Sequence, residues 1–466
     1  MNELPQVYPV TAHTDHVGSG STFVVINGSA QDGAVYIPQA LDRGARTLVV
    51  QEGVPLDATS MSAIAVHQAN LLRVPDTRLA LAQLSAQAWG YPAQRLTIIG
   101  VTGTKGKTTS VFLLRHILAR AGHRVAMISG VYNMIHDMIF PAALTTPTPD
   151  YLQMFLAQAV AAGVTHVVME VSAQALTLHR VADILFTGVI FTNLSLEHLE
   201  FYNSIEDYFA AKRLIFKQVK AGGMSVINGA NSWGKRLLAM EDGIDFAQFN
   251  VTQAGAAGIT GDIDYNGAPL TLYVPALMGE FNAQNIAGVC TLIAGLGVSS
   301  EVAARALATF TGVPGRMEQY RLRTGAVAVV DYAHNPSSFE SVLPTLKSHA
   351  RRLIVVFGAG GQRDPGRRPL MGAIAAQVAD LIVLTSDNPR TEDAGDICRD
   401  IIAGIAPIDQ YKVHVELDRA RAIAYGCINA QEGDIVAVLG KGPDEYQQIG
   451  LTKTFFSDRH EVAQHC

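Results

Sequence analysis

Residues 98–110, with the sequence IIGVTGTKGKTTS, constrain the fold more strongly than any other stretch of the chain. β-branched residues lead into glycines at positions 100, 103 and 106, and a lysine and two threonines follow. A buried strand that runs through a glycine turn into a helix is typical of parallel α/β sheets, where the turn binds phosphate. The strict P-loop spacing would require glycine at 101, where this chain has Val101. The stretch therefore predicts a nucleotide-binding α/β protein with a variant phosphate loop.

Apolar runs alternate with amphipathic segments on both sides of this loop. HVVMEVS at 166–172 and FTGVIFTNL at 186–194 predict buried strands, and the segments at 108–122 and 151–163 predict helices. Such alternation indicates a parallel sheet covered by helices.

Proline and glycine turns between the predicted elements divide the chain into domains. A small α/β unit comes first, with a helix expected over 71–90, and a turn containing Pro92 ends it. Pro314 and Gly315 precede a second doubly wound sheet. We therefore expect an α/β protein of three domains: a small N-terminal α/β domain at 1–92, a central ATP-binding domain with a P-loop-type parallel sheet at 93–315, and a Rossmann-like C-terminal domain at 316–466.

Composition excludes several classes of function. The chain has 466 residues, of which 48% are hydrophobic and 16% charged, and its net charge of −6 offers no basic face for nucleic acid or an anionic membrane. The four cysteines lie far apart without a C-x-x-C pair, and the first sixteen residues contain no apolar signal core. We expect a cytoplasmic enzyme with no nucleic-acid or membrane partner.

The residues around the loop suggest chemistry of their own. Lys107 can reach the phosphates of a nucleotide, and the Thr108 hydroxyl can bind Mg²⁺. Glu170 ends a predicted strand in the same sheet, where a carboxylate is well placed to bind the metal, although a solvated carboxylate fits that position as well. Position alone gives neither His198 nor Lys212 a special role.

Seven motifs occur in the order in which they stand in the Mur ligases. They are G-x-x-G-x-x-G-K-T-T, MEVS, TNL..EHL, AAK..IF, FN..N, PGRME and DYAHNP, and they cover about residues 20 to 450. The chain thus resembles this family of ATP-dependent, amide-forming enzymes of peptidoglycan synthesis, which are related to folylpolyglutamate synthase. VFGAGGQRDPGRRPLMG and SDNPRTED are similar to the segments that hold the amino acid in the branch adding the third residue of the peptide.

The resemblance implies a reaction, its substrates and its cofactors. ATP phosphorylates a carboxylate of UDP-N-acetylmuramoyl-L-Ala-D-Glu, and the amine of an amino acid attacks the acyl phosphate. The implied cofactors are ATP and Mg²⁺, and the implied protein is a cytoplasmic monomer serving cell-wall biogenesis, cell shape and cell division. By this resemblance the N-terminal domain binds the UDP substrate and the C-terminal domain binds the amino acid.

The resemblance also implies the site residues. Lys107, Glu170, His198 and a carbamylated Lys212 are catalytic, and Thr108, Glu170 and His198 bind metal. The ATP-binding residues are Gly103, Thr104, Lys105, Gly106, Lys107, Thr108, Thr109, Asn282, Asn285, Arg316, Asp331 and His334. The UDP substrate is bound by Thr14, Thr145, Thr146, Ser172 and Arg180. The amino acid is bound by Arg363, Asp387, Asn388, Pro389, Arg390, Gly440 and Asp444.

Arg390 indicates which amino acid is added. A distal carboxylate favours a fork-shaped guanidinium partner, and members of this branch that use lysine generally lack this arginine. We therefore expect meso-diaminopimelate.

Three positions depart from the family pattern. His13, Thr14 and Asp15 stand where Asp-Ser-Arg is usual, Leu178 replaces a glutamine, and Asp444 replaces a glutamate. These changes leave two alternatives open: a related ligase that joins another carboxylate and amine in a side pathway, and a nucleotide-binding relative without catalysis.

Overall fold

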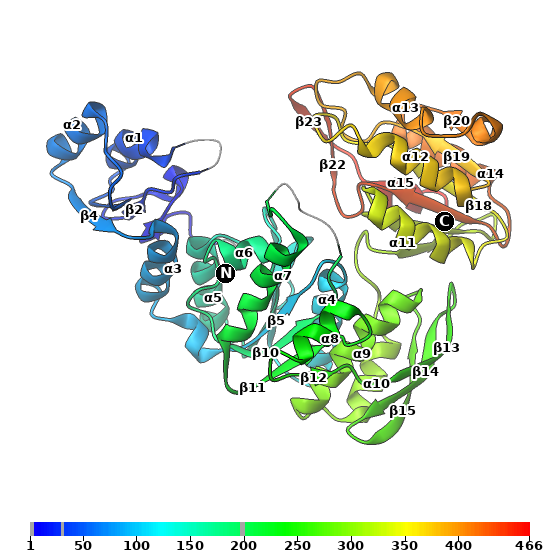
Figure 1. The fold of residues 1–466 in the computed structure, drawn as a ribbon, viewed down its shortest axis with the longest axis horizontal. Helices are drawn as coiled ribbons and strands as arrows, with labels where there is room; N and C mark the ends of the chain where they lie inside the picture. Colours follow the sequence, from blue (N-terminus) through cyan, green and yellow to red (C-terminus); the bar gives the residue numbers. More distant parts are fainter. Residues whose placement is uncertain (1–3, 29–31, 196–200) are drawn as a thin grey trace. The chain divides into compact units, whose positions relative to one another are not determined.

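A computed structural model describes residues 4–28, 32–195 and 201–466 (Figure 1). By its internal contacts the chain divides into two compact units. Unit 1 comprises Met1–Gln248, Asp264–Ala268 and Gln284–Ala306; unit 2 comprises Phe249–Ile263, Pro269–Ala283 and Leu307–Cys466. The sheets of both units are mainly parallel and covered by helices, so the predicted α/β class is confirmed. The domain limits at 92 and 315 stay a prediction.

The first sheet of unit 1 has four parallel strands in the order β1-β2-β3-β4. Its strands are β1 (Val10–Thr11), β2 (Thr22–Val24), β3 (Thr47–Gln51) and β4 (Asn70–Val74). The accompanying helices are α1 (Ile37–Asp42), α2 (Ala58–His67) and α3 (Thr77–Ala88), with 3-10 helices η1 (Thr14–His16), η2 (Gly33–Tyr36) and η3 (Pro92–Arg95).

The predicted helix over 71–90 is wrong in its first residues. Leu72 pairs with Val49 of β3, so this segment begins as strand β4. The helix starts only after Asp76, whose carboxylate accepts the backbone N–H groups of Arg78 and Leu79 at 2.8 and 3.1 Å. Such a side-chain cap fixes where a helix begins, and it overrides the apolar spacing that had favoured one long helix.

The second sheet of unit 1 has eight strands in the order β12-β11-β10-β5-β9-β6-β7-β8. They are β5 (Thr97–Thr102), β6 (Val125–Ile128), β7 (Tyr132–Ile135), β8 (Met138–Pro141), β9 (His166–Glu170), β10 (Phe186–Phe191), β11 (Val219–Ile227) and β12 (Ile244–Asp245). The helices are α4 (Lys107–Arg120), α5 (Pro149–Ala161), α6 (Ala173–Thr177), α7 (Ile205–Arg213) and α8 (Ser232–Leu238), with η4 (Leu214–Gln218).

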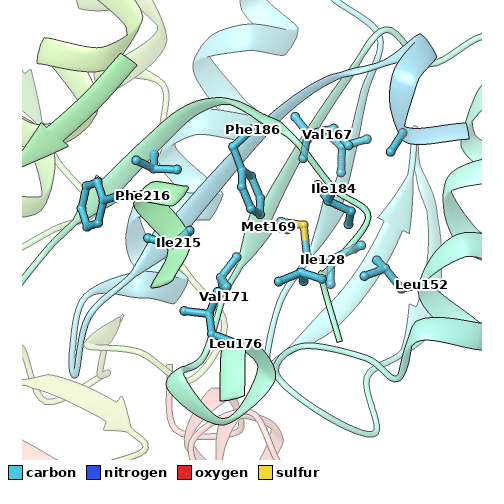
Figure 2. Close-up of a cluster of buried hydrophobic side chains, with 14 of the residues drawn as sticks. Ile128, Leu152, Val167, Met169, Val171, Leu176, Ile184, Phe186, Ile215 and Phe216 are labelled. Atoms are coloured by element: carbon cyan, nitrogen blue, oxygen red, sulfur yellow. The ribbon is translucent and has the colours of Figure 1, made fainter. Parts of the chain in front are cut away.

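The parallel strands at the centre of this sheet position the candidate site. Strands β10, β5, β9 and β6 pair in parallel, so their carboxyl ends meet at one edge. Phe186, Met169 and Ile128 belong to the apolar core beneath them and are almost completely buried (Figure 2). Burial of side chains on both faces explains why these strands are continuous apolar runs in the sequence.

Strands β7 and β8 form an antiparallel extension that the sequence analysis missed. They are joined by His136 and Asp137, and His136 has a φ of 53°. No glycine marks this turn, so the usual sequence signal of a two-residue hairpin is absent.

Unit 2 contains a six-stranded sheet in the order β16-β17-β21-β18-β19-β20, with only β16 antiparallel to its neighbour among the described strands. Its strands are β16 (Glu318–Arg321), β17 (Val327–Asp331), β18 (Leu353–Phe357), β19 (Leu381–Leu384), β20 (Val413–Val415) and β21 (Ile435–Leu439). Its helices are α11 (Pro336–Lys347), α12 (Arg367–Val378), α13 (Ala394–Ile402), α14 (Arg419–Asn429) and α15 (Asp458–Ala463), with η5 (Pro407–Lys412).

Smaller elements complete the chain. A hairpin of β22 (Tyr446–Ile449) and β23 (Thr452–Phe455) precedes α15. A three-stranded sheet is formed by β13 (Phe249–Gly255), β14 (Gly258–Tyr265) and β15 (Ala268–Val274), and helices α9 (Glu280–Gly295) and α10 (Ser300–Ala308) follow it. Across the described residues, no helix combines the length and apolar character needed to cross a membrane.

Candidate active site

The phosphate loop connects β5 to α4 at the carboxyl edge of the large sheet. Gly103 and Gly106 have φ values of 144° and 84°, which glycine adopts far more readily than other residues. A Cβ atom at Gly103 would collide with the Thr192 hydroxyl, and one at Gly106 would collide with the Asn285 amide. Both the backbone angles and the lack of space therefore explain the glycine spacing seen in the sequence, and Asn285 lies against the loop.

Two residues that sequence reasoning did not assign hold this loop. The Asn193 side chain accepts the Lys105 N–H at 2.9 Å and donates to the Lys105 carbonyl at 3.2 Å. The Thr192 hydroxyl donates to the same carbonyl at 2.6 Å, and the Thr104 N–H donates to the Asn193 carbonyl at 2.9 Å. These two residues directly follow β10 and form what we call the loop clamp. Their only sequence signal was the TNL motif, which carried no role.

Two lysines contact the loop carbonyls. The Lys107 ammonium donates to the carbonyls of Gly103 and Thr104, each at 2.9 Å. The Lys212 ammonium, from α7, donates to the Gly103 carbonyl at 2.8 Å and lies 4.4 Å from the ring centroid of Tyr208. Lys212 is only 1% exposed, so it is a buried lysine and not the solvated helix residue that its position alone suggested. His198 lies outside the described residues.

Glu170 ends β9 beside the loop strand. It pairs in register with Val101 of β5, and its Oε1 atom accepts the Gly130 N–H at 2.8 Å. The side chain is 2% exposed. Thr108 is the second residue of α4 and is also buried. A carboxylate and a hydroxyl are hard oxygen donors of the kind that Mg²⁺ prefers.

Four of the residues predicted to bind the UDP substrate gather around Glu170. The Thr146 hydroxyl donates to the Glu170 carbonyl at 2.9 Å and accepts the Ser172 N–H at 3.0 Å. The Arg180 guanidinium donates to the Thr146 carbonyl at 3.0 Å. The Thr145 hydroxyl lies beside Gly130, 3.2 Å from the place of an added Cβ atom.

Arg180 is a half-buried cation of this group. Burial lowers the pKa of its guanidinium below the ordinary value, and the charge of Arg78 lowers it further. Thr14 lies elsewhere, in η1 of the first sheet region. Its carbonyl accepts the Arg43 guanidinium at 2.7 Å, and Arg43 also pairs with Asp15 at 2.7 Å. Arg43, at the end of α1, therefore lies beside the motif of His13, Thr14 and Asp15, which lacks the arginine usual in the family.

The nucleotide residues predicted in the last part of the chain fall in unit 2. The Asp331 carboxylate accepts the backbone N–H groups of Met317 and Ala333, each at 2.8 Å. The Arg316 guanidinium lies 4.4 Å from the ring centroid of Tyr332. Burial lowers the pKa of His334, which contacts the Tyr332 carbonyl, so its imidazole is neutral near neutral pH.

Asn282 and Asn285, expected on the adenine side, belong to different units although both lie in α9. Asn282 is part of unit 2, where its side-chain amide donates to the Met278 carbonyl at 3.0 Å. Asn285 is part of unit 1, where it adjoins Gly106.

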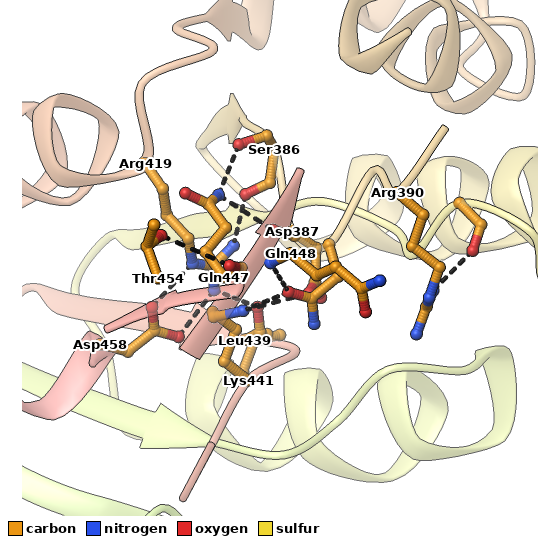
Figure 3. Close-up of polar contacts among 12 residues, drawn as sticks. Ser386, Asp387, Arg390, Arg419, Leu439, Lys441, Gln447, Gln448, Thr454 and Asp458 are labelled. Atoms are coloured by element: carbon orange, nitrogen blue, oxygen red, sulfur yellow. Dashed lines mark hydrogen bonds and ion pairs between the residues drawn. The ribbon is translucent and has the colours of Figure 1, made fainter. Parts of the chain in front are cut away.

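Most of the residues predicted to bind the amino acid follow β19 or β21, whereas Arg363 follows β18. Figure 3 shows Asp387 and Arg390 of this set. The Asn388 side-chain oxygen accepts the Lys441 ammonium at 3.1 Å and the Gln448 N–H at 2.8 Å. The Lys441 ammonium also lies 3.6 Å from the Asp387 carboxylate. Arg390 has a φ of 54°, and its guanidinium donates to the Gly361 carbonyl at 2.5 Å. Pro389 is buried between Asn388 and Arg390.

A buried ion pair supports this segment from behind. Arg419 and Asp458, both fully buried, form two hydrogen bonds of 2.7 Å. The same guanidinium donates to the carbonyls of Ser386 and Leu439 at 3.2 and 2.9 Å (Figure 3). The pair thus joins the ends of β19 and β21, and sequence reasoning did not find it.

Charge is concentrated around Asp444. Burial raises the pKa of the Asp444 carboxyl, although the charge of Lys441 opposes this shift. Burial also raises the pKa of Tyr332 to about 12, with a contribution from Asp444. Gly440, with a φ of 115°, leaves room for the Asp387 carboxylate, which would lie 2.8 Å from an added Cβ atom. Arg363 is exposed in the loop before α12. The binding roles of all these residues stay predictions.

Comparisons with known proteins agree with this geometry. Residues 101–293 match the Mur ligase middle domain, and residues 315–442 match the glutamate ligase domain of Mur ligases. The chain is 39% identical over 458 residues to the UDP-N-acetylmuramoyl-L-alanyl-D-glutamate–2,6-diaminopimelate ligase of Thermosynechococcus vestitus. The aligned region covers 95% of this chain and 90% of that protein.

Solved structures give the same picture of the fold. A structure of a ligase with the same name has a TM-score of 0.67 at 29% identity and covers 98% of this chain and 94% of that one. The MurF ligase of Thermotoga maritima, solved in complex with ADP, has a TM-score of 0.64 at 18% identity, with 94% and 95% covered. At that identity the second likeness concerns the fold alone.

Proposed function

Because the chain belongs to the Mur ligase family, we propose that it adds meso-diaminopimelate to UDP-N-acetylmuramoyl-L-Ala-D-Glu in peptidoglycan synthesis. As a member of this family it is an ATP-dependent ligase that forms a carbon–nitrogen bond. We further propose that it works as a monomer in the cytoplasm, without nucleic-acid or membrane partners. The net charge of −6 supports the absence of a nucleic-acid partner.

The position of Glu170 carries the proposal. Its strand pairs with β5, which ends in the phosphate loop, and its carbonyl accepts the Thr146 hydroxyl of the group around Arg180. A phosphate-binding site and a site with a half-buried guanidinium therefore share one strand end. A ligase that phosphorylates a carboxylate must hold two anions next to each other, and this arrangement provides a cationic or N–H-rich environment for each.

In the first step a carboxylate oxygen of the acceptor attacks the γ-phosphorus of ATP, and the bond to ADP breaks. The N–H groups at the start of α4 and the Lys107 ammonium face the transferred phosphate. To reach it, Lys107 exchanges its present bonds to the Gly103 and Thr104 carbonyls for phosphate oxygens. Arg180 and Ser172 orient the acceptor, because a guanidinium binds carboxylate or phosphate in a planar, bidentate way.

In the second step the amine nitrogen attacks the acyl carbon. The carbon–oxygen bond to phosphate breaks, phosphate leaves, and the nitrogen loses a proton. The residues proposed to present the amine are Asp387, Asn388, Arg390 and Asp444 in unit 2. Arg390 suits the distal carboxylate of diaminopimelate, whereas the neighbouring carboxylates suit an ammonium group.

Thr108 and Glu170 fit a bound Mg²⁺, and His198 is proposed as a further ligand. Within the described ranges, no group of three or more His, Cys, Asp or Glu side chains is placed to hold a metal ion. Mg²⁺ is usually held by one or two carboxylates together with substrate phosphates. When bound, the ion neutralises the charge that develops on the transferred phosphate.

Phosphate release tests the proposal. Purified protein is supplied with ATP, Mg²⁺ and UDP-N-acetylmuramoyl-L-Ala-D-Glu, and meso-diaminopimelate, L-lysine and L-ornithine are added one at a time. We expect release only with diaminopimelate, together with a tripeptide product of the corresponding mass. Phosphate release with another amine contradicts the proposed use of Arg390. No phosphate release with any amine contradicts the proposed acceptor.

A further inference from the structure

Arg367 is the first residue of α12, and neither the sequence nor the comparisons give it a role. The loop before it passes Gly360, a glycine surrounded by arginines. Arg390 Nη1, Arg363 Cγ and Arg367 Nη2 lie 3.2, 3.6 and 3.7 Å from the place of a Cβ atom on Gly360. Three cationic side chains of unit 2 therefore converge on one backbone position.

These three arginines differ from their neighbour Arg368. Arg368 is buried and pairs with Glu392 at 2.7 Å and with Asp400 at 2.9 Å. In the described part of the chain, Arg363, Arg367 and Arg390 form no ion pair with a carboxylate, and the buried Nε atom of Arg367 has no hydrogen-bond partner. Among the described residues, two carboxylates thus form ion pairs with Arg368, whereas none forms an ion pair with the other three arginines.

The electrostatics of Arg367 are unfavourable as it stands. Burial lowers the pKa of its guanidinium; the charge of Asp387 opposes that shift, whereas the charge of Arg363 adds to it. A cation at the first position of a helix also faces the positive end of the helix dipole. Neither the helix nor a protein ion pair therefore explains an arginine here, whereas a bound anion would relieve both costs.

The surroundings point to the incoming amino acid as the source of that anion. The Gly361 N–H donates to the Asn388 carbonyl at 3.0 Å, so the loop with Gly360 is fastened to the segment proposed to hold the amino acid. Glycines are needed for this contact, because a Cβ atom at Gly361 would collide with the Pro389 carbonyl. The arginine group is therefore continuous with the proposed amino-acid site.

We infer that Arg367 is a third cation of the amino-acid pocket and that, with Arg363 and Arg390, it selects an amino acid carrying two carboxylates. The inference rests on the proposed function and deepens it, because three guanidinium groups exceed what one α-carboxylate requires. A phosphate oxygen offers the same anionic chemistry, so the experiment separates the two sources.

The test compares Arg367→Gln, Arg367→Lys and the control Arg421→Gln, which removes an arginine that is mostly exposed on α14. KM is measured separately for diaminopimelate, ATP and the UDP-dipeptide. We expect Arg367→Gln to raise KM for diaminopimelate by roughly tenfold or more, as loss of a charge-assisted hydrogen bond does. KM for ATP should stay within about twofold, Arg367→Lys should recover part of the loss, and the control should match the wild type.

Each other outcome overturns a defined part of the account. An unchanged KM for diaminopimelate, or a larger rise in KM for ATP, contradicts the inference. If Arg367→Gln does not fold, Arg367→Lys decides by the same comparison of the two KM values. A wild-type protein that uses no amine contradicts the proposed function itself, whereas a wild type active with diaminopimelate and an equally active Arg367→Gln contradict only this inference.

Discussion

The loop clamp offers the sharpest test of how this chain holds ATP. Replacing Asn193 with alanine removes the side-chain partner of both the N–H and the carbonyl of Lys105, at 2.9 and 3.2 Å. The carbonyl keeps the Thr192 hydroxyl at 2.6 Å, so the loop loses part of its support and not all of it. Each neutral hydrogen bond contributes about 0.5–1.5 kcal/mol net, so the two together contribute about 1–3 kcal/mol.

Because the clamp acts on the loop that we propose binds phosphate, this cost should weaken ATP binding. With about 1.4 kcal/mol for each factor of ten, Asn193→Ala should raise KM for ATP roughly 5- to 150-fold. The kcat value at saturating ATP should change much less, since bound ATP itself orders the loop. The assay is steady-state phosphate release with ATP varied and the other substrates saturating.

Gln218→Ala is the matched control. Its side-chain amide likewise makes two hydrogen bonds to the backbone, in this case by donating to the carbonyls of Val181 and Ala182 at 2.6 and 3.2 Å. It precedes β11 and so lies at the amino end of that strand, away from the loop. An Asn193→Ala variant with the wild-type KM for ATP, or a Gln218→Ala variant with an equal rise, would refute the reasoning.

Three further substitutions test other parts of the account. Gly106→Ala drives a Cβ atom into a neighbouring amide and should abolish ATP binding in calorimetry, whereas Gly122→Ala, with a φ of 88° and open space at the end of the same helix, should retain it. Asp458→Ala strands the buried Arg419 guanidinium, so the free energy of unfolding in urea should fall by about 3–5 kcal/mol, and a fall below about 1 kcal/mol would contradict the ion pair's role. Burial raises the pKa of Asp444 above 3.8, so its ionised form destabilises the folded chain as pH rises through that window. Asp444→Asn should therefore raise the melting temperature at neutral pH but not below about pH 4, and a pH-independent difference would contradict this.

The glycine loop was predictable because its residue types encode backbone geometry. Gly103 and Gly106 occupy positive φ values that the spacing in the sequence already suggested. The strand ends were predictable for a similar reason, since buried parallel strands are continuous apolar runs. Glu170 could thus be placed beside the loop before the order of the strands was known.

The loop clamp and the buried ion pair could not be predicted in this way. Thr192 and Asn193 are ordinary polar residues after a strand, and only the pairing of β10 with β5 brings them to the loop. Arg419 and Asp458 are 39 positions apart in the sequence, so no local pattern links them. Charged residues are also normally expected at the surface and not in the core. Tertiary contacts of this kind leave no local periodicity, so the sequence alone carried no signal for them.

Transfer of ¹⁸O tests the central claim most directly, because that claim is that ATP activates a carboxylate held beside Glu170. UDP-N-acetylmuramoyl-L-Ala-D-Glu labelled with ¹⁸O in its glutamate carboxyl groups is converted with ATP and diaminopimelate, and the released phosphate is analysed by mass. Formation of an acyl phosphate predicts one ¹⁸O atom in each phosphate released with the product. Phosphate that carries no label, alongside labelled tripeptide, would contradict the proposed mechanism.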